Sequence, residues 1–185
     1  TACSSTTMQD NTFAAKENKD FTKYTNQLVV EYAENDYTTM HQFFEHPEDY
    51  GIDINNVDVS LGEFYTDNTE EIKEDQKELN KFNRSTLDKT QQTIYDELKY
   101  ENELSLKAEN KKFQYLNNCW SAMSGLHQSL ISVFSEYILR NEKDIQDLIT
   151  LINDVPRYTN DVLEYTKEQA DKNTLQFDYD SVTQD

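Results

Sequence analysis

The chain has 185 residues, the size of one domain, and carries 36 acidic but only 17 basic residues. The formal net charge of −19 at pH 7 excludes nucleic acid as a partner, because few cationic side chains could neutralise its phosphates. Only three glycines and two prolines occur, too few for the tight turns of a strand-rich fold, while a hydrophobic content of 36 % argues against a disordered chain. Long helices are therefore expected.

The N-terminal sequence is typical of the remnant of a lipoprotein signal. Small residues surround Cys3 in the run Thr1-Ala2-Cys3-Ser4-Ser5, as they do where a signal peptidase cleaves and a lipid joins the sulfur. Residues 1–19 are mostly polar with little periodicity, which predicts a flexible tether. No run of about 18 apolar residues occurs, so we expect membrane attachment only through a lipid on Cys3. These features predict an exported protein on the extracytoplasmic face of the cell membrane; a chance terminal cysteine is the alternative.

The first predicted helix runs from Asp20 to about Asn35. A shorter helix follows and ends near Pro47, where an irregular segment near residues 45–65 begins and continues through Gly62. The apolar stripe of the first helix repeats at spacings of three and four and consists of Phe21, Tyr24, Leu28 and Tyr32.

Two further helices are predicted between residues 67 and 116. Asp67 or Asn68 can cap the first of them, which carries the stripe Ile72, Leu79 and Phe82 and ends near residue 83. Asp88 and Gln91 can form a capping pair that begins the next helix. Its apolar pattern continues to about Leu116, which would make it the longest helix of the chain.

The C-terminal part of the sequence predicts three more helical segments. The low-charge pattern Leu126, Leu130, Phe134, Tyr137 predicts the most buried helix, the centre of the core. Asn141 is expected to cap a helix, and Pro156 to begin another that fades near Asn173. The buried stripe predicted for the helix after Asn141 is Ile145, Leu148, Ile149 and Ile152.

The pattern as a whole predicts an all-α fold, an irregular multi-helix bundle of about five to six helices. The domain boundaries expected are a tether over residues 1–19, a helical domain over 20–173 and a tail over 174–185.

No recognisable catalytic or metal-binding motif is present. A helical zinc hydrolase needs two histidines one turn apart, as in His-Glu-x-x-His, but the only histidines are His41, His46 and His127. His41 and His46 are five positions apart, about 140° around a helix, so we expect surface or capping roles for them. Neither cysteine has a histidine neighbour in sequence, and no Gly-x-Ser-x-Gly occurs. We therefore predict no catalytic, cofactor-binding or metal-binding residue in this chain.

Cys119 and the pairs of neighbouring acidic residues are also interpreted as structural and not as functional residues. Cys119 lies beside Trp120 and is predicted to be a small buried hydrophobe that forms no disulfide. Acidic pairs that could serve as acid–base dyads or calcium ligands are attributed to chance among 36 carboxylates; they include Glu45 with Glu48 and Glu101 with Glu103.

Several short motifs, taken together in their order along the chain, resemble the N-terminal half of bacterial lipoproteins in the domain-of-unknown-function 885 (DUF885) family. The resemblance extends from about Phe21 to Asp180. Its motifs are Pro47-Glu48-Asp49-Tyr50-Gly51-Ile52, Leu61-Gly62, Phe82-Asn83-Arg84-Ser85-Thr86-Leu87, Gln91-Gln92-Thr93-Ile94-Tyr95-Asp96, Met123-Ser124-Gly125-Leu126, Ser135-Glu136-Tyr137, Lys143-Asp144-Ile145-Gln146-Asp147 and Val155-Pro156-Arg157-Tyr158.

The resemblance implies a largely helical protein of several hundred residues, exported and often lipid-anchored, and similar to zinc metallopeptidases. The family's His-Glu motif lies downstream of the matched segment, so zinc is expected only in the part that follows this chain. The sequence departs from the family pattern at Ile131, which replaces a proline, at Leu148, which replaces a tyrosine, and at Asn173, which replaces a glycine. These departures would fit a fragment or a degenerate copy.

Two functions remain open at this level. The chain is either the non-catalytic N-terminal region of a metallopeptidase-like protein or a stand-alone acidic binding module at the cell surface. In the first case it packs against the catalytic half of the same protein, helps to wall the substrate cleft and meets a peptide substrate only through that half. In the second case exposed tyrosines and Trp120 supply recognition. A complete enzyme is set aside because the motifs are missing.

Overall fold

The computed structural model describes residues 16–121 and 123–176, and within these ranges the fold is all-α, as predicted. Cys3 and most of the expected tail lie outside the described residues. None of the described helices combines the length and the apolar character needed to cross a bilayer. The α-helices are α1 (Lys19–Asn35), α2 (Tyr37–Phe43), α3 (Thr69–Leu79), α4 (Lys89–Ala108), α5 (Leu126–Ser135) and α6 (Glu142–Asp171), with short 3-10 turns η1 (Pro47–Tyr50) and η2 (Arg84–Thr86).

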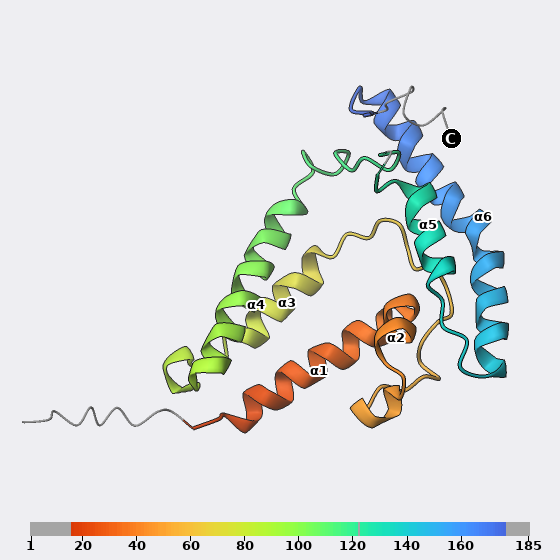
Figure 1. Cartoon of the computed structure of the whole chain (residues 1–185). Helices are drawn as coiled ribbons and strands as arrows, with labels where there is room; N and C mark the ends of the chain where they lie inside the picture. The colour runs from red at the N-terminus through yellow and green to blue at the C-terminus, as the bar shows by residue number, and fades with distance from the viewer. Residues whose placement is uncertain (1–15, 122, 177–185) are drawn as a thin grey trace, which may run out of the picture.

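The helices form an open triangular frame (Figure 1). One side is α1, a second is the pair α3 and α4, which pack against each other, and the third is formed by α5 and α6. Residues 109–125 connect α4 to α5, and the irregular segment 51–68 passes beside α6 on its way to α3. The centre of the frame is therefore not filled by any helix.

The starts of α3, α4 and α6 lie where the sequence predicts them, whereas Pro156, expected to begin a helix, lies inside α6. Asp88 and Gln91 form a reciprocal capping box at the start of α4. Asn141 and Asp144 form a second capping box at the start of α6. At α3 the residue in the N-cap position is Asn68, which contributes no side-chain hydrogen bond.

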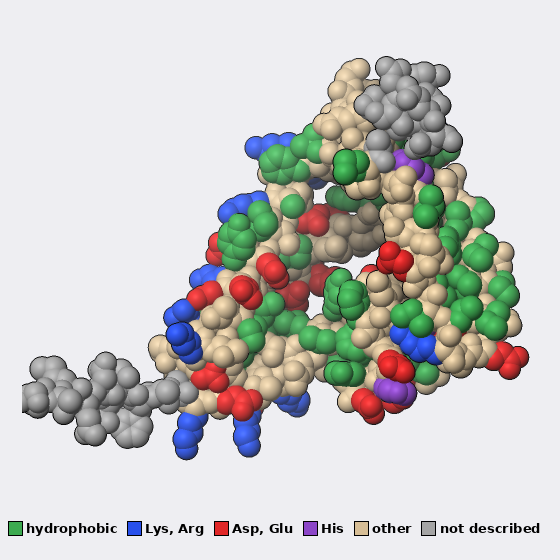
Figure 2. Space-filling view, viewed as in Figure 1, with side chains coloured by type: hydrophobic (Ala, Val, Ile, Leu, Met, Phe, Trp, Pro, Cys, Tyr) green, Lys and Arg blue, Asp and Glu red, His purple; other side chains and the backbone are tan. Residues whose placement is uncertain are grey.

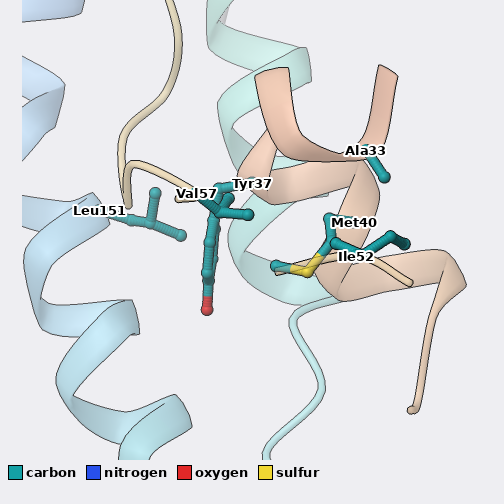
Figure 3. Packing of buried hydrophobic residues seen from close by; sticks show 6 residues of the cluster. All are labelled: Ala33, Tyr37, Met40, Ile52, Val57 and Leu151. Atoms are coloured by element: carbon teal, nitrogen blue, oxygen red, sulfur yellow. The ribbon is translucent and has the colours of Figure 1, made fainter. Parts of the chain in front are cut away.

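The buried apolar residues gather in three separate clusters, one near each corner of the frame. The first joins α1, α2 and the segment after η1 to α6 (Figure 3). The second joins α1 to α3 and α4, and the third joins residues 115–126 to the second half of α6. The buried members are Ala33, Tyr37, Met40, Ile52, Val57 and Leu151 in the first, Phe21, Leu79, Leu87 and Tyr95 in the second, and Cys119, Val162 and Tyr165 in the third.

Two predicted helix boundaries are wrong. α4 ends at Ala108, not near Leu116, because Phe113 and Leu116 remain exposed and gain no burial that would favour a further helical turn. The longest helix is instead α6, which continues through Pro156. A proline inside a helix removes one backbone hydrogen bond, so the helix must be held on both sides of it. Leu151 and Val162, each fully buried, provide that support.

The predicted burial of α5 and α6 is also wrong. α5 contains no fully buried residue. Its apolar side chains are at most half-buried, although the helix carries little charge. Ile145, Ile149 and Ile152 of α6 were expected in the core but are 45–51 % exposed. The buried positions in this half of α6 are Asp144, Asp147 and Leu151. Figure 2 shows hydrophobic side chains along the outer side of the frame at α6.

Two alanine substitutions can test which face of α6 is buried. Leu151→Ala should lower the free energy of unfolding by about 2–5 kcal/mol, because it leaves a cavity in the first cluster. Ile149→Ala, two positions away on the outer face, should change it by less than about 0.5 kcal/mol. Urea unfolding of both variants measures the difference. A larger loss of stability for Ile149→Ala than for Leu151→Ala would show that the isoleucine stripe is the buried face.

Candidate functional site

The open centre of the frame is a groove of about 1370 Å³. It is bordered by α1, α3, α4 and residues 61–66, and Figure 2 shows the hollow in the middle of the molecule. The volume exceeds the roughly 300–1,000 Å³ of a small-molecule site. The groove is therefore large enough for a peptide segment.

The floor of the groove is apolar. Three helices contribute half-buried aliphatic side chains to it, for example Leu28 from α1, Ile72 from α3 and Leu98 from α4. Two tyrosines of α1 also line it, Tyr24 and the 63 % exposed Tyr32. Aliphatic and aromatic side chains that remain partly exposed on one concave surface offer apolar area to a ligand.

The rim of the groove is acidic. Among the residues that the structure describes, no lysine, arginine or histidine lines the groove, so the carboxylates that face it meet no cationic side chain within it. These carboxylates come from α1, α3, α4, the N-cap of α2 and residue 63, and are Glu31, Asp36, Glu63, Glu71, Asp75, Glu101 and Glu109.

Burial and the neighbouring carboxylates shift the pKa of two groups in the groove. Burial, followed by the nearby charges of Glu71 and Glu31, raises the pKa of Asp75 above its ordinary value. Burial, with the charges of Asp75 and Glu31 among its neighbours, raises the pKa of Tyr24 to about 12. For both groups burial is the larger cause, and the neighbouring carboxylates add a smaller contribution of the same sign.

The wall of the groove formed by residues 61–63 is held in place by α6. The backbone N–H of Leu61 donates to Asp154 Oδ2 at 2.8 Å, and Arg157 Nη2 donates to the carbonyl of Gly62 at 2.7 Å. Arg157 also pairs with Asp154 and Asp161, and the hydrogen bond from Arg157 is the main cause that holds the pKa of Asp154 below its ordinary value. Gly62 has a φ of 72°, the left-handed conformation that glycine adopts without strain.

His41, expected at the surface or at a helix cap, is instead 7 % exposed. Its Nε2 donates to the carbonyl of Ile138 at 2.8 Å, and its ring stacks on Tyr137 with centroids 4.2 Å apart. Arg140 Nη1 donates to the carbonyl of His41 at 2.9 Å, and Asp144 Oδ1 lies 3.9 Å from His41 Nδ1. Its side chain therefore ties α2 to the segment between α5 and α6, which the linear sequence could not reveal.

Tyr37 forms the central hydrogen bond of this polar cluster. Its hydroxyl donates to Asp147 Oδ2 at 2.9 Å and lies 2.8 Å from the hydroxyl of Tyr137. Burial, together with these two partners, raises the pKa of Tyr37 well above its ordinary value. Lys143 pairs with the same carboxylate of Asp147 from the solvent side.

The remaining residues singled out in the sequence do not converge on one site. His46 lies beside Glu48 on the surface, and His127 is half-buried in α5. Glu101 lines the groove but Glu103 does not. Cys119 is buried, as predicted, and burial raises the pKa of its thiol. In the part of the chain that the structure describes, no three histidine, cysteine, aspartate or glutamate side chains group as metal ligands would.

The groove itself was missed by sequence reasoning. Its carboxylates belong to helices that are far apart in the chain, and each is one among many acidic residues on a solvated face. The only sequence signal was the excess of acidic residues, which does not say where on the surface they gather.

These features define an open, acidic, all-α protein with a peptide-sized apolar groove. The model of the bacterial proteins of unknown function named DUF885 matches residues 53–182, well over half of the chain. The chain therefore belongs to the DUF885 family, as its motifs indicate, although Pro47–Tyr50 and the helices before it precede the matched range. Comparison with curated proteins and with solved structures found no match.

The Tyr37 hydrogen bonds can be tested by Tyr37→Phe, which keeps the ring in the first cluster but removes the hydroxyl. The loss should lower the free energy of unfolding by about 1–2 kcal/mol, because the buried Asp147 loses a donor. Tyr100→Phe, at a residue 67 % exposed, is the control and should have almost no effect. Equal urea midpoints for the two variants would contradict a stabilising role.

The destabilising effect of ionised Asp75 can be tested by Asp75→Asn. A folded-state pKa above the ordinary value means that ionised Asp75 destabilises the fold at neutral pH. This effect fades as pH falls through the raised pKa and is absent below about 4. The substitution should raise the melting temperature at pH 7 by on the order of 1–2 °C and leave it unchanged near pH 3.

Glu70→Gln on the same helix provides the control for Asp75→Asn. Glu70 pairs with Lys73 at 2.7 Å, so removing its charge should lower the melting temperature slightly or leave it unchanged. A lower melting temperature for Asp75→Asn at pH 7 would contradict a destabilising effect of ionised Asp75.

Proposed function

We propose that this chain is the non-catalytic helical region of a metallopeptidase-like protein, exported and anchored through a lipid on Cys3. In this proposal it packs against a catalytic half encoded downstream and helps to wall a peptide-binding cleft, and zinc would belong to that half. Support for the peptidase assignment comes from the family resemblance, and support for a packing role comes from α6.

The observation that carries the packing role is the outer face of α6. Ile145, Ile149, Ile152 and Leu163 are 43–51 % exposed and lie on one side of the helix, since residues 145 and 163 are separated by five full turns. Single exposed hydrophobic residues are ordinary, but a row of four along one helix is typical of an interface. A partner surface that covers this row would bury it as a core face.

A stand-alone binding module at the cell surface is the second candidate. The apolar groove favours it, because the groove is already bordered on three sides without a further domain. The two candidates differ in what the gene encodes beyond Asp185. A His-Glu pair followed by a further histidine is expected under the proposed function, whereas a stop codon without such a motif would leave only the binding module.

The interface on α6 can be tested by co-expressing this chain with the downstream polypeptide and measuring whether the two purify together. Ile149→Glu should abolish the association, because a charge would be buried in an apolar contact. The matched control is Leu104→Glu on α4, where the native side chain is 51 % exposed compared with 48 % at Ile149. Loss of association in both variants, or in neither, would argue against α6 as the interface.

A further inference from the structure

We propose that the groove between α1, α3 and α4 is a docking site for a cationic amphipathic peptide, one that carries lysine or arginine beside apolar side chains. The proposal does not rest on the packing of α6, because no residue of α5 or α6 lines the groove. Either idea can therefore fail without the other.

The charge of the partner follows from the rim. Within the described ranges, seven carboxylates face the groove and no cationic side chain does. Elsewhere on the same helices, acidic residues are paired with lysines, as Glu70 is with Lys73 and Glu74 with Lys77. Among the described residues that line the groove, no lysine or arginine pairs with these carboxylates, and positive charge on a ligand would supply such a partner.

The apolar part of the partner follows from the floor. Leu28, Ile72 and Leu98 are half-buried and accessible from the groove. A ligand that carried only charged groups would leave this apolar surface in contact with water. Tyr32, 63 % exposed, adds an aromatic face that a lysine or arginine can contact. A peptide that places apolar side chains on the floor and cations at the rim satisfies both regions.

Other occupants fit less well. A small molecule would fill only part of about 1370 Å³. A second copy of the chain carries a net charge of −19 and would be repelled by the rim, and the same repulsion applies to nucleic acid and to an anionic lipid surface.

The first experiment measures binding of synthetic peptides to the full chain by fluorescence anisotropy. The test peptide is a labelled amphipathic helix of lysine and leucine, and a second peptide has serine in place of each leucine. The leucine peptide should bind at low salt and weaken by about tenfold when salt is raised to about 0.5 M. The serine peptide and spermine should bind at least about tenfold more weakly, because they cannot cover the floor.

The second experiment compares two triple variants with the same loss of charge. Glu31→Gln, Glu71→Gln and Glu101→Gln remove three carboxylates from the rim, whereas Glu70→Gln, Glu97→Gln and Glu103→Gln remove three from outside the groove. The rim variant should bind the leucine peptide about tenfold more weakly, and the control variant no more than about threefold more weakly.

Several outcomes would overturn the proposal. Equal weakening in both variants would mean that an acidic protein attracts cations without a specific site. Equal affinity for the leucine peptide, the serine peptide and spermine would mean that the apolar floor has no role. Absence of binding at low salt would exclude a cationic peptide altogether. The peptide comparison uses the unaltered chain, so it decides the question even if a variant does not fold.

Discussion

The contact between Tyr37 and α6 joins two sides of the triangular frame. The ring of Tyr37 is 4 % exposed in the first cluster, and its hydroxyl binds Asp147 on α6 and Tyr137 before it. The same residue thus joins an apolar contact to a polar one, and both lie at the corner where the first and last helices of the described chain meet. The third cluster and the bonds from Asp154 and Arg157 to the segment 61–62 connect α6 to other parts of the chain, but neither reaches α2.

This corner also determines the orientation of α6. Asp147 accepts from Tyr37 of α2, which places this carboxylate on the buried side of α6. Asp144, which accepts from the backbone N–H groups of Arg140 and Asn141, is buried as well. Leu151, one turn further along, follows them into the core. The isoleucines on the opposite side of the helix are then left 45–51 % exposed. Buried polar groups that are well bonded can thus decide which face of an amphipathic helix is buried, against the preference expected from hydrophobicity alone.

The open frame provides both surfaces on which the proposals depend, the central groove and the outer face of α6. The buried apolar side chains of the described residues are gathered into three corner clusters, and the middle of the molecule is left as a groove lined by seven carboxylates. A chain with a net charge of −19 has a physical reason to remain open there, since closing the groove would bring like charges together. A partner on the outer face of α6 would remove apolar surface from water. A cationic ligand in the groove would pair with carboxylates that have no cationic partner there among the described residues.

The features that depend on neighbouring residues could be predicted from the sequence. The capping boxes at Asp88 and Asn141 and the first helix are local, because each is formed by hydrogen bonds or spacings within one turn. The features that depend on distant partners could not be predicted. The burial of His41 requires Ile138 and Arg140, nearly 100 positions away, and the continuity of α6 through Pro156 requires packing on both sides of the proline. The sequence by itself determined that the chain is acidic, helical and a member of its family. Only the tertiary structure decided which face of α6 is buried and where the carboxylates gather, because hydrogen bonding and charge repulsion between distant segments depend on positions in space.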